Sequence, residues 1–136
     1  MLLRIVIFVG AAVLLVATAR SEDHLNPSTI NQFRAANGRS VLHQSNVLAS
    51  LCAEHARDMA RWESLDHNGF FEHRGPSGAM AENVAYGCTT EACTIRQWAH
   101  SAGHRRNMLL PNAESYGIAS AVSPRGRRYW CVDFGQ

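Results

Sequence analysis

The chain has 136 residues, of which 13 are basic and 11 are acidic, and every basic residue is an arginine. This even charge balance excludes the strongly basic surface by which nucleic-acid-binding proteins are recognised. The length fits one small domain that follows a short leader.

The leader is predicted at the N-terminus. A short basic start, Met1 to Arg4, precedes an almost unbroken apolar run over residues 5–16, and Ala17-Thr18-Ala19 then supplies small residues. This order is typical of a secretory signal peptide, here occupying residues 1–19. A transmembrane anchor is the alternative, but the run is short for a bilayer. We therefore expect a single exported domain of residues 20–136, periplasmic or secreted, without a stable membrane anchor after cleavage.

All four cysteines lie in the exported part, and their even number favours two disulfides over free thiols or a zinc site. The sequence permits three pairings. Cys88 and Cys93 flank a four-residue loop and pair most readily with each other. Cys52 would then join Cys131 and tie an early helix to the last strand.

Two helices are predicted in the first half of the domain. Asn26 as N-cap and Pro27 in the first turn would open one that Gly38 ends. Ser45 would cap a longer helix that runs to about Ser64. Its apolar stripe fits a helix packed on a sheet and consists of Leu48, Leu51, Cys52, His55, Met59 and Trp62.

The second half begins with a long loop over residues 65–80, of the kind that often carries function. We expect a helix from Thr90 to His100 and a short one from His104 to Leu109. Tyr116–Val122 and Arg128–Phe134 are predicted strands around a turn at residues 123–126. Gly117, Ala119 and Ala121 make the first strand thin, which suggests that another element packs closely on it.

The stretch Ala81–Gly87 holds a single carboxylate, Glu82, among small and apolar residues. A buried carboxylate needs charged or hydrogen-bonding partners, and we expect Glu82 to hold His67 and His104 in a small polar cleft. A carboxylate that accepts an imidazole N–H leaves the other ring nitrogen free. Two such rings can bind a divalent cation such as Zn²⁺, or one can act as general base. A polar cluster that only fastens two loops to the core is the alternative.

The remaining histidines near these segments are less favoured. His55 lies on the apolar stripe of the second helix and is expected to pack at the edge of the core. His100 and His104 are four residues apart, as two ligands on one helix face would be. Gly103 between them favours a helix end instead.

Five segments occur in the order that is typical of one family. They are Ala53–Met59 in the second helix, Leu65–Phe70, Ala81–Gly87, Trp98–Leu109 and Tyr129–Gly135. Over residues 26–136 the chain resembles the CAP superfamily, which comprises cysteine-rich secretory proteins, venom antigens and plant pathogenesis-related proteins. The resemblance implies an α+β fold, an α-β-α sandwich with a small antiparallel sheet between helices.

The resemblance also implies a cleft with two histidines and two acidic residues. His67 and Glu82 match the first histidine and first glutamate, and His104 matches the histidine of the Gly-His-Arg segment of bacterial members. Ser101 stands where eukaryotic members have the second acid. We therefore expect a ligand-binding cleft formed by His67, Glu82, Asn83, Ser101 and His104, in which His67 and His104 would bind a metal.

Members of this family have been associated with sterol or fatty-acid binding, divalent-metal binding, proteolysis and antimicrobial action, so the fold leaves the function open. The leading hypothesis is a non-catalytic binding module for a small or lipidic ligand, with a divalent cation as the only cofactor considered. A metal-assisted hydrolase that uses Glu82, His67 and His104 is the competing hypothesis. A structural envelope protein that binds a protein partner is the third.

Overall fold

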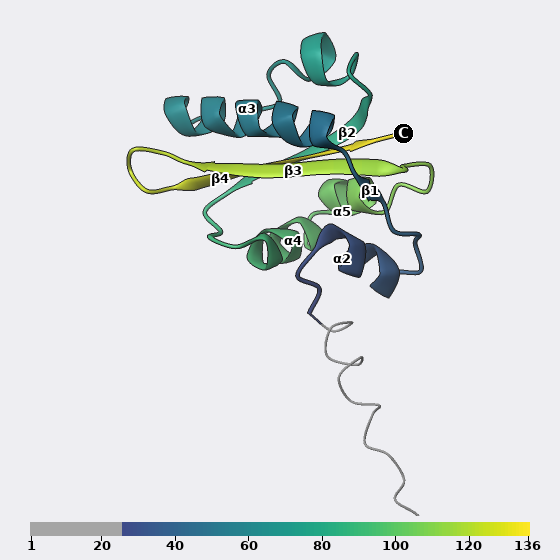
Figure 1. The fold of residues 1–136 in the computed structure, drawn as a ribbon. Helices are drawn as coiled ribbons and strands as arrows, with labels where there is room; N and C mark the ends of the chain where they lie inside the picture. The colour runs from purple at the N-terminus through teal and green to yellow at the C-terminus, as the bar shows by residue number, and fades with distance from the viewer. Residues whose placement is uncertain (1–25) are drawn as a thin grey trace, which may run out of the picture.

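The computed structural model describes residues 26–136 (Figure 1). A sheet forms the middle layer, with the long helix α3 (Asn46–Trp62) on one face. Three shorter helices cover the other face: α2 (Ile30–Ala36), α4 (Glu91–Ala99) and α5 (Ala102–Met108). The predicted α+β sandwich is confirmed. The signal peptide expected over residues 1–19 lies outside the described residues.

The sheet has four strands in the order β1-β3-β4-β2, namely β1 (His43–Gln44), β3 (Ser115–Val122), β4 (Arg128–Gly135) and β2 (Ala79–Tyr86). The three long strands are antiparallel, as expected, whereas the two-residue β1 pairs with β3 in parallel. β2 is therefore an edge strand of the sheet.

Helix starts follow side-chain capping. Ser45 is an N-cap, as predicted, and Thr90, expected as the first helical residue, is the N-cap of α4. Their hydroxyl groups accept hydrogen bonds from the backbone N–H groups of Leu48 and Cys93. The prediction that Asn26 caps the first helix is wrong. Thr29 has the extended backbone of an N-cap and accepts from the N–H of Gln32, so the helix begins one turn later.

Helix α3 lies very close to β3. A Cβ atom added to Gly117 would stand 2.0 Å from the backbone nitrogen of Ala49, so only glycine permits this approach. The prediction that another element packs closely on this strand is therefore confirmed. The prediction that Trp62 belongs to the apolar stripe packed on the sheet is wrong, because its side chain is 74% exposed and lies beside Arg61 at the end of the helix.

The opposite face of the sheet carries the larger core. Its buried members come from α2, α4, α5 and alternate positions of β3 and β4, and include Ile30, Phe33, Ile95, Trp98, Met108, Tyr116, Trp130, Val132 and Phe134. Both disulfides form as expected. Cys52–Cys131 joins α3 to β4, and Cys88–Cys93 closes the loop before α4.

Two segments have regular secondary structure that the sequence did not predict. Residues 79–86 form strand β2, because their backbone pairs with β4 along its whole length. Within the expected loop, Phe70–Arg74 forms a π-helical turn that starts after Gly69, whose φ of 74° is left-handed. Among residues 26–136, no helix combines the length and the apolar character that a membrane span requires.

Candidate functional site

Glu82 lies on β2 directly opposite Asp133 of β4, and both side chains face α3. The side chain of Glu82 is 2% exposed and that of Asp133 is fully buried. Two neighbouring buried carboxyl groups require either a positive charge or a proton, because burial disfavours the charged form.

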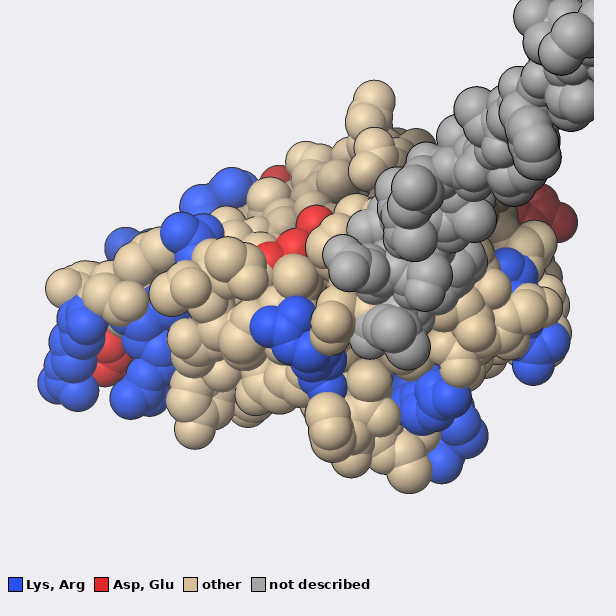
Figure 2. Space-filling model, turned by 90° about the horizontal axis from the view of Figure 1, so that it is seen from below, with Lys and Arg blue, Asp and Glu red and all other residues tan. Residues whose placement is uncertain are grey.

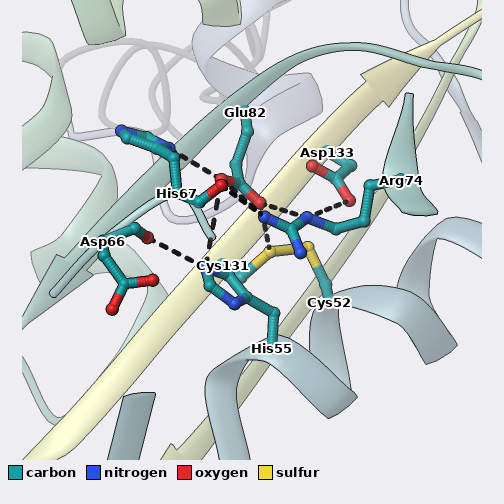
Figure 3. Close-up of a disulfide and its surroundings, with 8 residues drawn as sticks. All are labelled: Cys52, His55, Asp66, His67, Arg74, Glu82, Cys131 and Asp133. Carbon is teal, nitrogen blue, oxygen red and sulfur yellow. Dashed lines mark hydrogen bonds and ion pairs between the residues drawn. A yellow bond between two sulfur atoms is a disulfide. The ribbon is translucent and has the colours of Figure 1, made fainter. Parts of the chain in front are cut away.

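Arg74 supplies the positive charge from the π-helical turn (Figure 3). Its Nε lies 2.6 Å from Oε2 of Glu82 and 3.8 Å from Oδ2 of Asp133. Its Nη2 donates to Oε1 of Glu82 at 3.1 Å. The guanidinium therefore lies between the carboxyl groups and itself is almost completely buried.

His67 occupies the remaining side of Glu82. Its Nδ1 lies 2.7 Å from Oε1 of Glu82, where the carboxylate accepts the N–H of the ring. The other ring nitrogen, Nε2, is left free for a ligand, as in carboxylate–histidine pairs that support metal sites. The His67 side chain is 56% exposed, so it is the solvent-facing member of this group.

His55 also belongs to the site, although the sequence favoured only a packing role. It is buried on α3, its Nε2 lies 4.0 Å from Oε1 of Glu82, and the same nitrogen donates to the backbone carbonyl of Asp66 at 2.9 Å. This bond fixes the start of the segment that carries His67. A hollow of about 280 Å³ between α3 and residues 68–74 reaches His55 and Arg74 from the surface.

His104 is held from the other face of the sheet, and by Asn83 rather than by Glu82. Asn83 is fully buried and donates to the backbone carbonyl of His104 at 2.9 Å. Asn107 secures this contact by donating to Oδ1 of Asn83 and to the backbone carbonyl of Glu82. Neighbouring residues of one strand thus hold two histidine-bearing segments, one on each face.

The protonation of two groups is shifted by their surroundings. Burial and the positive charge of His67 lower the pKa of His104, so its neutral form is favoured near pH 7. Burial and the neighbouring Glu82 carboxylate raise the pKa of Asp133 to about 8, against the opposing effect of Arg74. Asp133 is therefore largely protonated at neutral pH.

Asp133 is the second acidic residue near Glu82. It does not occupy the position of Ser101, where eukaryotic members of the family have their second acid. Ser101 is the half-buried N-cap residue of α5, and its hydroxyl makes no capping hydrogen bond. The second carboxyl group of the cluster around Glu82 is therefore the buried side chain of Asp133 on β4.

The side chains of residues 26–136 supply no closed metal site. In the described part of the chain, Cys52, Cys131 and Asp133 form the one group of three potential ligands within 4.8 Å of one another. This group does not suit an ion, because both sulfurs are in a disulfide. His67 and His104 lie outside this group.

Sequence reasoning missed Arg74 and Asp133. Asp133 had a signal, since it is the one charged residue within the otherwise apolar run from Tyr129 to Phe134. Arg74 had none, because an arginine in a loop is ordinarily solvated. Only the π-helical turn brings it back over Glu82.

Fold and site together define a small disulfide-linked α-β-α sandwich in which a buried glutamate of the central sheet positions a histidine. The chain belongs to the CAP family, since the model of the "Cysteine-rich secretory protein family" matches residues 28–134. The chain matches none of the curated proteins with which it was compared.

Solved structures support the same fold. An extracellular protein containing an SCP domain from Bacillus anthracis aligns with a TM-score of 0.64 and 22% identity over 79% of this chain and 37% of that one. An outer surface protein from Borrelia burgdorferi gives 0.65 and 16% over 89% and 96%. A cysteine-rich secretory protein from Staphylococcus aureus gives 0.58 and 18% over 79% and 36%. The chain thus spans little more than a third of two of these proteins.

Proposed function

We propose that the chain is an exported binding module of the CAP family that holds a small or lipidic ligand beside His67 and performs no chemical step. The observation that carries the proposal is that both carboxylate oxygens of Glu82 already have a partner. Arg74 lies 2.6 Å from one carboxylate oxygen and His67 lies 2.7 Å from the other. A general base must reach a proton of the substrate or of water. Glu82 instead positions His67.

The ligand would meet two imidazole rings of different character. His67 is exposed and has its tautomer fixed by Glu82, so Nε2 is available as a hydrogen-bond acceptor. His104 is half-buried and tends to be neutral. Ser101, whose hydroxyl does not cap α5, adds a donor to the same segment. These groups suit a ligand with polar atoms at one end.

A divalent cation such as Zn²⁺ fits this donor set. His67 and His104 would hold it, and Glu82 would support His67 from behind, as carboxylates do in many metal sites. Bound there, the cation would polarise an oxygen of the ligand. With two imidazoles and no third protein ligand, binding would be weaker than at a closed structural zinc site.

Two further observations support a binding role and export. Every cysteine of the described chain is in a disulfide, so no thiol is available as nucleophile. Two disulfides in so small a domain suit an oxidising compartment. The similar structures include proteins named as extracellular or outer surface proteins.

The test compares wild-type protein, purified from its own host, with His67→Ala and His104→Ala. His100→Ala is the matched control, because His100 is an exposed histidine that ends the preceding helix. Organic extraction followed by mass spectrometry should find a co-purified small molecule in wild type and control, and much less in both site variants. Zinc content after loading and desalting should follow the same order.

A turnover assay distinguishes the binding module from the competing hydrolase. Zinc-loaded wild-type protein should leave a library of peptides and esters intact. Turnover that His67→Ala abolishes and His100→Ala preserves would overturn the binding module in favour of a metal-assisted hydrolase. Equal ligand and zinc content in all four proteins would place binding away from these histidines and would equally overturn the proposal.

A further inference from the structure

The chain contains two Asn-Gly dipeptides, Asn37-Gly38 and Asn68-Gly69, and their surroundings in the fold differ. Asparagine is chemically labile, above all before glycine, because glycine has no Cβ atom to hinder the attack of its backbone nitrogen on the asparagine side chain. This attack needs an asparagine side chain that can turn and a glycine nitrogen that is not engaged elsewhere. Hydrogen bonds can therefore protect one dipeptide and leave the other reactive.

The reactive groups of Asn37-Gly38 are all held by hydrogen bonds. The Nδ2 of Asn37 donates to the backbone carbonyl of Phe33 at 2.8 Å, and its Oδ1 accepts from Nη2 of Arg105 at 2.7 Å. The N–H of Gly38 donates to the carbonyl of Ala35 at 3.1 Å. The end of α2 thus fixes both the amide and the nitrogen that would attack it.

Asn68-Gly69 lies between α3 and the π-helical turn, and its reactive groups are free. Asn68 is exposed, and its backbone N–H donates to Oδ1 of Asp66 at 3.0 Å. Within residues 26–136, neither the side-chain amide of Asn68 nor the N–H of Gly69 has a hydrogen-bond partner. The nucleophile and the group that it attacks are therefore both available in the folded protein.

We propose that Asn68 is a site of spontaneous deamidation in the folded protein. The backbone nitrogen of Gly69 forms a bond to Cγ of Asn68, and the side-chain nitrogen leaves as ammonia with the proton of the Gly69 N–H. Water then opens the cyclic succinimide at one of its two carbonyl carbons. Opening at one carbon yields aspartate, and opening at the other yields isoaspartate, in which the main chain runs through the former side chain.

Either product adds a negative charge to the α3 side of the molecule. Asn68 borders the hollow of about 280 Å³ whose walls also carry Glu54 and Asp58. Figure 2 views the lower face of the molecule, the side of α2, α4 and α5 in Figure 1, and arginine side chains occupy much more of this visible surface than acidic ones. Deamidation therefore increases the difference in charge between the two sides.

Isoaspartate also alters the backbone beside His67. It adds a methylene group to the main chain between His67 and Gly69, within the turn in which the N–H of Phe70 donates to the carbonyl of His67 at 3.1 Å. The modification thus acts on the segment that presents this histidine. Its effect on a ligand rests on the proposed function, whereas the modification itself is measured without any ligand.

The test follows both dipeptides in one protein by peptide mass mapping. Trypsin cleaves after arginine and separates them, since residues 35–39 contain Asn37 and residues 62–74 contain Asn68. In folded protein kept in mildly alkaline buffer, Asn68 should convert about tenfold faster or more, because three hydrogen bonds must break before Asn37-Gly38 reacts. In urea with reductant, both should convert at similar rates. Isoaspartyl methyltransferase should label residues 62–74 of the aged folded protein.

Arg105→Ala is the matched variant, because it removes one of the bonds that hold Asn37. Conversion of Asn37 should rise by about fivefold, and that of Asn68 should stay unchanged. Equal rates at the two dipeptides in folded wild-type protein would overturn the proposal, and so would an Asn68 that converts only after unfolding. An unchanged rate at Asn37 in Arg105→Ala would contradict hydrogen bonding as the cause of the selectivity.

Discussion

The two faces of the central sheet differ in what they bury. Toward α2, α4 and α5 the sheet presents many large apolar side chains. Toward α3 it presents a smaller apolar cluster, which includes Val84 and Tyr129, together with a disulfide and charged groups. One strand contributes to both. Trp130, Val132 and Phe134 of β4 belong to the large apolar core, and Cys131 and Asp133 alternate with them on the other face.

The two faces therefore contribute to the stability of the domain in different ways. Buried charges cost free energy unless they are compensated, so a face that holds Glu82, Asp133 and Arg74 contributes little hydrophobic stabilisation there. The α3 face compensates by a covalent bond and by the close approach of Ala49 to Gly117. The apolar face stabilises the domain by burial of large side chains. The site can therefore keep an arrangement that is poor for stability.

The largest expected effect tests how much α3 depends on its disulfide. Loss of Cys52–Cys131, which spans 79 residues, should lower the free energy of unfolding by about 4–5 kcal/mol in the loop-entropy model. Loss of Cys88–Cys93, which spans 5 residues, should cost about 2 kcal/mol. Double Cys→Ala variants and urea unfolding measure both. Equal losses would mean that the α3 face is not specially dependent on its covalent bond.

The next effect compares the two buried arginines. Arg74→Met leaves Glu82 without its cation and should cost about 3–5 kcal/mol. Arg34→Met on the apolar side removes hydrogen bonds to three backbone carbonyls but strands no carboxylate, and should cost about 1–3 kcal/mol. Urea unfolding at neutral pH gives both values.

A double variant distinguishes charge from packing in this comparison. If Arg74→Met destabilises because a carboxylate is left alone, then Arg74→Met/Glu82→Gln should recover a large part of the loss. Additive losses would attribute the role of Arg74 to packing alone, and the two faces would then differ less than their charges suggest.

A pH-dependent effect should come from Asp133. Its pKa rises from 3.8 to about 8 on folding, so unfolding between those values releases a proton, and the free energy of unfolding falls as the pH rises. The slope contributed is about 1.4 kcal/mol per pH unit where the difference is one full proton. Asp133→Asn should remove this slope, so the variant gains stability relative to wild type from pH 5 to pH 7.

The measurement is urea unfolding of both proteins at several pH values. Glu114→Gln is the control, because Glu114 is an exposed acid in the segment before β3 and should leave the slope unchanged. Parallel stability curves for wild type and Asp133→Asn would show that Asp133 is ionised in the folded protein and that Arg74 neutralises both carboxyl groups.

Local signals allowed much of the fold to be predicted. Ser45 caps its helix through its own hydroxyl group, and the small residues of β3 revealed the approach of α3. β2 escaped prediction because its pairing partner, β4, lies more than forty residues later in the chain, and its own composition does not alternate. Trp62 was misplaced because helical spacing cannot indicate where the sheet beneath a helix ends.

The site was predicted only in part, because some of its contacts follow from local residue types and others depend on the fold. The pairing of Glu82 with His67 follows from residue types, since a buried carboxylate needs a donor. The roles of Arg74 and Asp133 depend on a π-helical turn and on strand register, which no short motif encodes. Strand alternation could have separated Glu82 from Asn83, but only after residues 79–86 were recognised as a strand.

The smallest effect tests whether the two faces meet at the edge strand β2. Glu82 holds His67 on one face and Asn83 holds the His104 segment on the other, yet the charge of His67 acts on His104. His67→Gln should therefore raise the pKa of His104, which should still stay below 6.5 because burial, the larger cause, persists. Imidazole NMR titration measures this pKa, with His43→Gln at the opposite sheet edge as control. An unchanged pKa of His104 in His67→Gln would separate the rings electrostatically, and a shared ligand site would lose its physical basis.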